Sequence, residues 1–466
     1  MSRTLIRGGL VVTAAEEVHA DVLVEDEKIV ALATTGSTVA EGWTAGTVID
    51  ATGTYVVPGG VDAHTHMELP FGGTFASDTF ETGTRAAAWG GTTTIVDFAV
   101  QSVGESLRAG LDAWHAKAEG NCAVDYAFHM IVSDVNEDSL KEMDLLVDEG
   151  VTSFKLFMAY PGVFYSDDGK ILRAMQRGAD NGGLIMMHAE NGIAIDVLVE
   201  QALAAGRTDP RYHGEVRREL LEAEATHRAI RLAEVAGAPL YVVHVSAQQA
   251  VAELATARDR GLNVFAETCP QYLFLSTDNL AEPDFEGAKY VCSTPLRPRE
   301  HQAELWKGLR TNDLQVVSTD HCPFCFVGQK ELGRGDFSKI PNGLPGVENR
   351  MDLLHQAVVD GHISRRRWIE IACATPARMF GLYPRKGTIA PGADADIVIY
   401  DPDAEQVMSA STHHMNVDYS AYEGKQVRGK ARTVMSRGTV VVDRDRYLGR
   451  AGHGRYQTRE TCQYLV

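Results

Sequence analysis

The sequence predicts a mixed α/β protein: a (β/α)8 TIM barrel carrying a small β-sandwich that the N- and C-terminal segments form together. Two observations lead to this fold. The middle of the chain alternates helical segments with short, continuously apolar runs, which are typical of parallel strands covered on both faces. Both ends of the chain consist of short strands that alternate apolar and polar residues. Eight parallel strands alternating with helices predict a closed barrel.

The same pattern divides the chain into three segments. Residues 1–57 and residues 385–466 are expected to build the β-sandwich, the latter with a C-terminal extension, and residues 58–384 the barrel. No low-complexity linker separates these segments. The expected barrel strands are 56–66, 91–98, 125–131, 152–158, 184–188, 240–244, 263–267 and 314–318, and the expected helices are 79–89, 107–118, 140–148, 171–179, 216–235 and 249–258.

Size and composition exclude several classes of protein. A chain of 466 residues can bury a large core, and its net charge of -19 argues against binding nucleic acid. No signal peptide is recognisable and no apolar run is long enough to span a bilayer, so we expect a cytoplasmic protein without a membrane partner. The 7 cysteines are scattered, which indicates reduced thiols. Cys322 and Cys325 form one CxxC motif without a second pair to complete a zinc site, so their role stays open.

The first expected barrel strand ends in two histidines. Residues i and i+2 of a strand point to the same face, so His64 and His66 present both imidazoles to one point. Two neutral imidazoles beside a carboxylate, from Asp62 or from elsewhere in the chain, begin a transition-metal site.

Further metal-ligating side chains follow other strands of the barrel. His188 ends the fifth expected strand, His244 ends the sixth, and Asp320 follows the eighth. The carboxyl ends of all strands in a (β/α)8 barrel open on one face, where active sites lie. Four histidines and an aspartate at that face therefore predict a metal site.

Lys155 interrupts an apolar strand and is expected to point into the barrel among these ligands. The alternative is an ammonium that reaches water or pairs with a buried carboxylate. The charge balance argues against an ammonium in either form. Two divalent ions bring +4, whereas Asp320 and a bridging hydroxide remove only two, so a further positive charge would worsen the excess. Burial and neighbouring cations favour a neutral amine, which can add carbon dioxide. The resulting carbamate carries one negative charge and two oxygens, so it can bridge two metals about 3.5–4 Å apart.

These motifs resemble those of the amidohydrolase superfamily, and three longer segments resemble its dihydropyrimidinase and hydantoinase branch. The likeness covers almost the whole chain, including the terminal strands. The superfamily motifs are HTH at 64–66, FKL at 154–156, HAEN at 188–191, HVS at 244–246 and STDH at 318–321; the branch-specific segments are KLFMAY at 155–160, STPLR at 293–297 and PNGLPGVE at 341–348.

The resemblance implies hydrolysis of a cyclic amide at two divalent metal ions, most often Zn2+, held with a carboxylated lysine in a homotetramer. It places one metal on His64, His66, Lys155 and Asp320, and the other on Lys155, His188 and His244. It places Tyr160, Ser293 and Asn342 at the substrate ring, and Leu69, Phe71 and Phe157 on the loops around the pocket.

A mechanism follows from these residue types. A water bridging two metals serves as hydroxide near neutral pH and attacks a ring amide carbonyl. Tyr160 can donate to the oxyanion that develops. Asp320 can accept the proton and pass it to the leaving nitrogen. Backbone groups near Ser293 and Asn342, on loops after the seventh and eighth strands, can pair with the polar edge of an imide.

The expected substrates are dihydrouracil and dihydrothymine, which give N-carbamoyl-β-amino acids, and 5-substituted hydantoins; the sequence does not choose among them. Allantoinase and dihydroorotase are alternatives with the same metals. Dihydroorotate would require a cation in the pocket, for which Arg297 is a candidate, whereas Tyr160 favours the dihydropyrimidine branch. A non-catalytic scaffold like the collapsin response mediators is a further alternative, but such scaffolds lack ligands that are present here.

Overall fold

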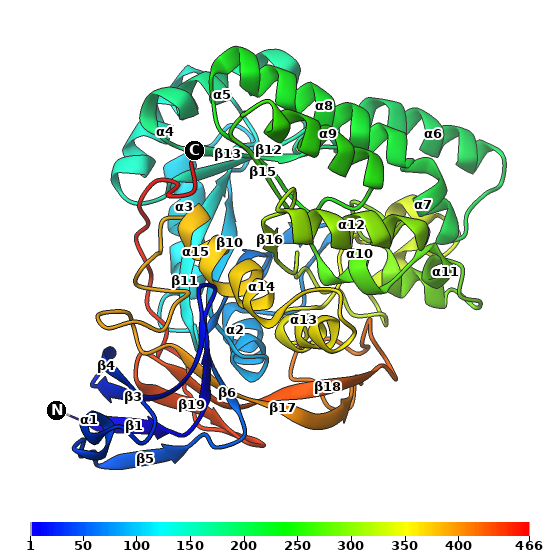
Figure 1. Cartoon of the computed structure of the whole chain (residues 1–466). Helices are drawn as coiled ribbons and strands as arrows, with labels where there is room; N and C mark the ends of the chain where they lie inside the picture. The colour runs from blue at the N-terminus through cyan, green and yellow to red at the C-terminus, as the bar shows by residue number, and fades with distance from the viewer. Residues whose placement is uncertain (1, 466) are drawn as a thin grey trace.

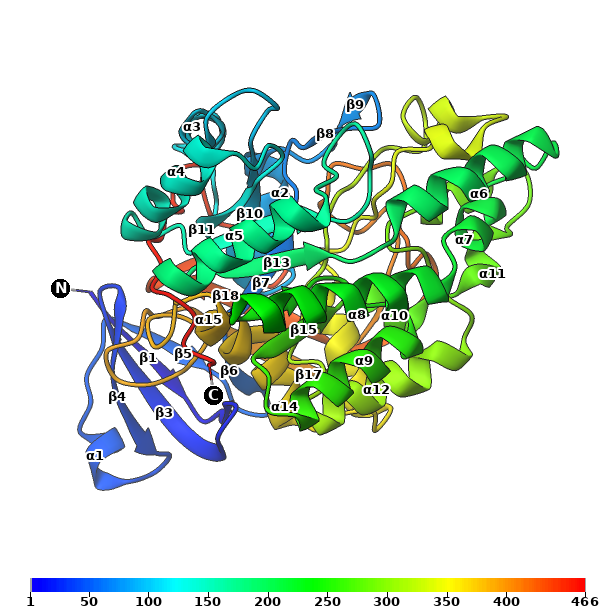
Figure 2. The same cartoon turned by 90° about the horizontal axis from the view of Figure 1, so that it is seen from above.

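The structure, a computed structural model, describes residues 2–465 and has two parts, a barrel surrounded by helices and a curled sheet below it in the view of Figure 1. The chain begins in the sheet, passes through the barrel, and returns to the sheet near its C-terminal end. The view in Figure 2, turned by 90°, places the N-terminal strands β1, β3 and β4 beside the barrel helices. The expected α/β architecture is confirmed.

Eight parallel strands form the barrel, each paired with its neighbours in chain order. Nearly every residue in these strands is buried, which explains their continuously apolar sequences. The strands are β7 (Gly60–Thr65), β10 (Thr92–Val100), β11 (Asp125–Ile131), β12 (Ser153–Phe157), β13 (Leu184–His188), β14 (Leu240–Val242), β15 (Val264–Thr268) and β16 (Val316–Val317).

Side chains close the barrel at the seam between β7 and β16. Asp62 accepts hydrogen bonds from the backbone N–H and the hydroxyl of Thr319, at 3.1 and 2.6 Å. Arg350 donates from Nη1 to the carbonyl oxygens of Val61 and Val317, each at 3.0 Å. These bonds join the first strand to the last, so residues that follow the two strands become neighbours. Asp62 is thereby engaged in the seam and not in the metal site.

The first expected strand, 56–66, is divided between the two parts of the molecule. β6 (Tyr55–Pro58) pairs with β17 (Ile397–Val407) of the curled sheet, whereas β7 belongs to the barrel. The chain crosses at Gly59, where a Cβ would lie 2.0 Å from Oγ1 of Thr93, so only glycine fits without movement. The apolar sequence is continuous across this crossing and contains no sign of it other than the glycines.

Helices connect the strands and surround the barrel. The six expected helices are present, but 216–235 is interrupted at Arg217 and Arg218, where Arg217 leaves helical geometry with ψ 63. The helix Gly192–Ala204 after β13 and the helices after β15 and β16 were not expected. The α-helices are α1 (Thr38–Glu41), α2 (Phe80–Trp89), α3 (Leu107–Ala118), α4 (Glu137–Asp148), α5 (Asp168–Asn181), α6 (Gly192–Ala204), α7 (Arg211–Val216), α8 (Glu219–Ala236), α9 (Gln248–Asp259), α10 (Pro270–Phe274), α11 (Thr277–Leu280), α12 (Glu300–Thr311), α13 (Arg350–Val359), α14 (Arg365–Ile369) and α15 (Thr375–Met379). The 3-10 helices η1 (Glu286–Tyr290), η2 (Lys330–Gly333) and η3 (Phe337–Lys339) and the π-helix η4 (Glu370–Ala374) complete the set. Among residues 2–465, none of these helices combines the length and apolar character that crossing a membrane requires.

The N- and C-terminal strands pair into one curled sheet, as expected from their alternating sequences. The central contacts join β17 to β6 antiparallel and β6 to β2 parallel. Isoleucine, valine and alanine side chains from both ends of the chain share one buried cluster. The sheet contains β1 (Arg3–Arg7), β2 (Leu10–Val12), β3 (Glu17–Glu25), β4 (Lys28–Thr34), β5 (Thr47–Asp50), β6, β17 (Ile397–Val407), β18 (Gln426–Ser436), β19 (Thr439–Asp443) and β20 (Arg446–Tyr447); a separate hairpin, β8 (Pro70–Phe71) and β9 (Thr74–Phe75), follows the first barrel strand.

A buried ion cluster joins the barrel to the sheet. Nζ of Lys386 lies 2.6 Å from a carboxylate oxygen of Asp125, which begins β11, and 2.7 Å from one of Asp396 beside β17. Asp394 lies 3.0 Å from the same ammonium. The opposite charges compensate one another away from water, as buried charges require.

Candidate metal centre

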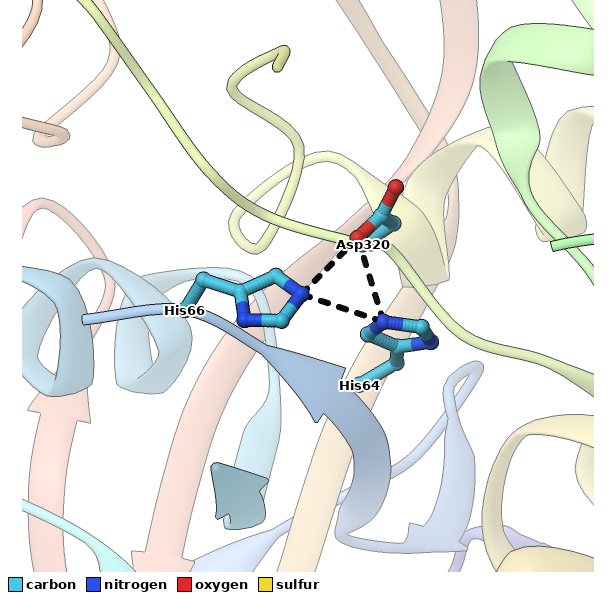
Figure 3. A group of neighbouring side chains, drawn as sticks. All are labelled: His64, His66 and Asp320. Atoms are coloured by element: carbon cyan, nitrogen blue, oxygen red, sulfur yellow. Dashed lines mark hydrogen bonds and ion pairs between the residues drawn. The ribbon is translucent and has the colours of Figure 1, made fainter. Parts of the chain in front are cut away.

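The barrel seam brings His64, His66 and Asp320 together at the carboxyl ends of the strands (Figure 3). Oδ1 of Asp320 lies 3.1 Å from Nε2 of His64 and 3.2 Å from Nε2 of His66. The two Nε2 atoms are 3.2 Å apart. All three side chains are buried and direct one ligand atom to a common point. Burial alone would raise the pKa of Asp320, but the neighbouring His64 and His66 hold it well below its usual range.

A second pair of histidine nitrogens converges beside this group. Nδ1 of His188, at the end of β13, lies 3.0 Å from Nε2 of His244, which follows β14. The His188 and His244 ring centroids are 4.6 Å apart, and His64 lies 5.5 Å from His244. The structure therefore brings all four sequence-predicted histidines to one face of the barrel.

Lys155 points into the barrel, as its place in the apolar strand predicts. Its Nζ lies 4.7 Å from the ring centroid of Phe98 and 4.9 Å from that of Phe157. Within residues 2–465, no carboxylate oxygen lies within the 4.0 Å of an ion pair with this nitrogen. Burial lowers the pKa of Lys155 to about 8, although Asp320 and Glu267 oppose this effect. A buried amine of lowered basicity is the form that adds carbon dioxide.

Two glutamates orient the histidines from outside the site. Glu267 accepts from Nδ1 of His64 through a short contact, and Glu190 lies 2.8 Å from Nε2 of His188. Carboxylates on the outer nitrogen are the usual support of metal-ligating histidines. Sequence reasoning missed both roles. Glu267 ends an apolar strand just as the histidines do, so the same signal could have identified it.

The residues predicted to contact the substrate line one cavity, which also reaches the predicted metal ligands. These ligands, called the metal-ligand group below, are His64, His66, Lys155, His188, His244 and Asp320. The cavity wall includes the predicted Leu69, Phe71, Phe157, Tyr160, Ser293 and Asn342 together with His66, Lys155, His188, His244 and Asp320. Four further lining residues were not predicted: Ile131, Phe164, Cys322 and Gly343. Cys322 thus has a place in the cavity wall, whereas Cys325 lies outside it and both thiols are free.

Besides the metal-ligand group, the polar side chains Tyr160, Ser293 and Asn342 line this cavity. Nδ2 of Asn342 donates to Oγ of Ser293 at 3.0 Å. Tyr160 adopts a φ of 63, and its ring lies 5.4 Å from that of His188. Burial raises the pKa of Tyr160 to about 12, so its phenol keeps its proton across the neutral range.

Two other residues of the motifs serve the structure and not the cavity. His321 accepts from the backbone N–H of Gly346 at 3.0 Å through Nδ1 and pairs with Asp78 through Nε2. Arg297, considered above as a cation for a substrate carboxylate, donates to Glu222 at 2.7 Å and is absent from the cavity wall.

The residues at this site fit a pair of divalent metal ions. The Nε2 atoms of His64 and His66 face each other with one carboxylate oxygen between them, an arrangement that a shared cation explains. The buried Nδ1 atoms of His66 and His244 have no hydrogen-bond partner within residues 2–465. Imidazole and carboxylate ligands suit zinc and similar divalent ions.

Comparison with known proteins identifies the family. The chain belongs to the amidohydrolase family, which matches residues 55–441. It is 82% identical over 465 residues to a D-hydantoinase of Streptomyces coelicolor, with 100% of each chain covered. A D-hydantoinase of Geobacillus stearothermophilus is 50% identical over 98% of this chain and 96% of its own. The crystal structure of dihydropyrimidinase from Brevibacillus agri matches with a TM-score of 0.96 and 51% identity, covering 98% of this chain and 99% of that one. The predicted membership of the hydantoinase and dihydropyrimidinase branch is confirmed, and with it the prediction that the protein is a cyclic amidohydrolase.

Proposed function

We propose that the protein hydrolyses a ring amide bond of 5-substituted hydantoins, of dihydropyrimidines such as dihydrouracil and dihydrothymine, or of both. The observation that carries this proposal is the single cavity in which the metal-ligand group meets Tyr160, Ser293 and Asn342. The names of its relatives, D-hydantoinase and dihydropyrimidinase, support the same substrates and favour the D configuration at the 5-position.

Two divalent metal ions, which we take to be Zn2+, would be held by residues already in place. His64, His66 and Asp320 would hold one ion, and His188 and His244 the other. Lys155 would bind both as a carbamate, formed when its amine adds carbon dioxide to make a new N–C bond and releases a proton. When bound, the two ions would lower the pKa of a water molecule so that hydroxide is available near neutral pH.

The remaining steps belong to side chains of the chain itself. Asp320 would take the proton of the attacking water and give it to the leaving ring nitrogen, since its lowered pKa keeps it ionised and ready to accept. Tyr160 would donate its hydroxyl to the oxygen of the attacked carbonyl as negative charge develops there. Its raised pKa supports this role, because the donor proton stays on the phenol.

The walls of the cavity would select the ring. Backbone groups at Ser293 and Asn342 would pair with the polar edge of the imide, while Leu69, Phe71 and Phe157 would contact the substituent. These apolar side chains suit an apolar substituent better than a charged one. A dihydroorotase-like function is disfavoured, because Arg297 is buried and paired with Glu222.

A substrate panel tests the proposal. Purified, zinc-loaded protein is assayed for kcat/KM with hydantoin, 5-phenylhydantoin enantiomers, dihydrouracil, allantoin and dihydroorotate. We expect the first three classes to be hydrolysed, with the D enantiomer preferred, and the last two to be poor substrates. Preference for allantoin or dihydroorotate would contradict the proposal, and a protein that retains no zinc after loading and hydrolyses none of these rings would support a scaffold.

We further propose a cytoplasmic homotetramer, on the resemblance described above. Light scattering after size exclusion measures the mass of the assembly directly. A monomer at micromolar concentration would contradict the tetramer.

A further inference from the structure

Lys330 is a buried lysine without a carboxylate partner. It begins η2, and its side chain is completely shielded from solvent. Within residues 2–465, no carboxylate oxygen lies within 4.0 Å of its Nζ, in contrast to Lys386, which is surrounded by three. Burying an ammonium is costly, and burial lowers the pKa of Lys330 to about 7. A lysine in such a place needs a compensating set of hydrogen bonds.

Three backbone carbonyl oxygens supply those bonds. Nζ of Lys330 donates to Val291 at 2.8 Å, to Pro341 at 2.7 Å and to Gly343 at 2.8 Å. Three acceptors match the three protons of an ammonium group. The lysine is therefore fully used as a hydrogen-bond donor, and it belongs to no ion pair of the described chain.

These carbonyls lie on the two segments that form the polar wall of the cavity. Val291 precedes Ser293 by two residues, whereas Pro341 and Gly343 stand on either side of Asn342. The segments also meet directly, because the N–H of Gly343 donates to the carbonyl of Val291 at 3.0 Å. Lys330 itself does not line the cavity.

We propose that Lys330 is a positioning residue for substrate binding, which holds Ser293 and Asn342 at the separation that the polar edge of the ring requires. The inference rests on the proposed function, because it takes these two residues as the partners of that edge. Lys330 touches neither the substrate nor the metal ligands; it acts through the backbone of the two segments.

The surroundings explain why the two segments depend on this residue. Gly343 lies close to the chain after β16, since a Cβ there would be 2.1 Å from the carbonyl oxygen of Cys322, so the segment packs tightly on that side. Without the ammonium, the carbonyl oxygens of Pro341 and Gly343 would lose their buried donor. They would regain hydrogen bonds only by moving outward toward water, away from Ser293.

The test compares Lys330→Met with wild type. Methionine keeps an unbranched, apolar side chain of similar length and removes all three donors. Measured quantities are kcat and KM with the best ring substrate, the inhibition constant of the N-carbamoyl product, the metal content and the melting temperature. Lys330→Gln, which keeps part of the donor set, is the second variant should methionine prevent folding. Lys339→Met is the matched control, since this lysine in the neighbouring η3 is 71% exposed and pairs with Asp336 at the surface.

We expect KM and the product inhibition constant of Lys330→Met to rise about tenfold or more, with kcat changed far less. This pattern is expected because the lost interactions stabilise the bound substrate and the transition state equally. Lys330→Gln should lie between wild type and Lys330→Met, and metal content should stay at the wild-type level in every variant. A folded Lys330→Met or Lys330→Gln protein with wild-type KM would overturn the inference, as would loss of metal with unchanged KM. A wild-type protein that hydrolyses no cyclic amide would overturn the proposed function and the inference together. An active wild type with an unchanged KM in the variants would overturn the inference alone.

Discussion

Oδ1 of Asp320 lies 3.1 Å from Nε2 of His64, although one residue follows the last barrel strand and the other ends the first. Side chains of Asp62 and Arg350 join these strands at the seam, and the backbone N–H of His66 donates to the carbonyl oxygen of His321 at 2.8 Å beside the contact. A metal-ligand group that spans a seam depends on barrel closure for its geometry.

Lys155→Ala should lose at least one metal ion and nearly all activity, because the carbamate that would bridge both ions is absent. Metal content by atomic emission and turnover are measured on the purified variant. Short carboxylic acids should partly restore activity by supplying the missing oxygens. A variant that keeps both metals and normal turnover would exclude the carbamate.

Tyr160→Phe should lower kcat by about 10²–10³ with little change in KM, the usual effect of removing one oxyanion donor. Phenylalanine keeps the ring, which packs at 5.3 Å against Phe71. Tyr165→Phe, a nearby tyrosine outside the cavity wall, serves as the control. Unchanged kcat in the Tyr160 variant would reduce this residue to a packing role.

Asp320→Asn should keep much of its metal but lose about 10²–10⁴ in kcat, because an amide cannot carry the proton to the leaving nitrogen. The limb of kcat/KM that rises with pH should also shift or disappear, although titration of the metal site couples to it. Complete loss of metal would make Asp320 chiefly a ligand. Normal turnover would assign the proton transfer to another group.

Glu267→Gln should weaken metal binding by about 10- to 100-fold, because the carboxylate that orients His64 through Nδ1 is replaced by a neutral amide. Competition with a zinc chelator measures the affinity, independently of activity. Glu253→Gln is the matched control, because Glu253 also pairs with a histidine, His227, but on the surface. Equal affinities in the two variants would count against the orienting role.

Asp352→Asn should change the pH dependence of stability without affecting the site. Asp352 accepts from the Tyr400 hydroxyl and from Gln406, each at 2.8 Å, and burial raises its pKa from 3.8 to about 7. Between these values the native protein holds a proton that the unfolded chain has released, so the contribution of this group to stability falls as pH rises.

The melting temperature of wild type minus that of Asp352→Asn should therefore fall between about pH 4 and 7 and stay level above pH 7. The corresponding loss in the free energy of unfolding is on the order of 1 kcal/mol or more. Asp403→Asn, whose carboxylate is 73% exposed, is the control. A difference in melting temperature between wild type and Asp352→Asn that stays constant across this pH range would contradict the prediction.

The sequence by itself determined the order of the eight barrel strands, the presence of six of the helices and the residues at the strand ends that are able to bind a metal. Periodicity is a local property, so continuously apolar runs identified the buried strands, and polar residues such as His188 that end them marked the site. All parallel strands of a barrel end at one face. The position of a residue at the carboxyl end of its strand was therefore enough to predict that it lies near the residues that end the other strands.

The family resemblance already placed Asp320 with the histidines, but only the tertiary structure shows why Asp62, which is closer in sequence, does not join them: its carboxylate is hydrogen-bonded to Thr319 in the seam. The tertiary structure also decided that Arg297 pairs with Glu222, that Glu267 supports His64, and that Lys330 joins the segments of Ser293 and Asn342. These pairings connect residues far apart in the chain, and their geometry depends on how the whole barrel closes, which no local pattern of residues records.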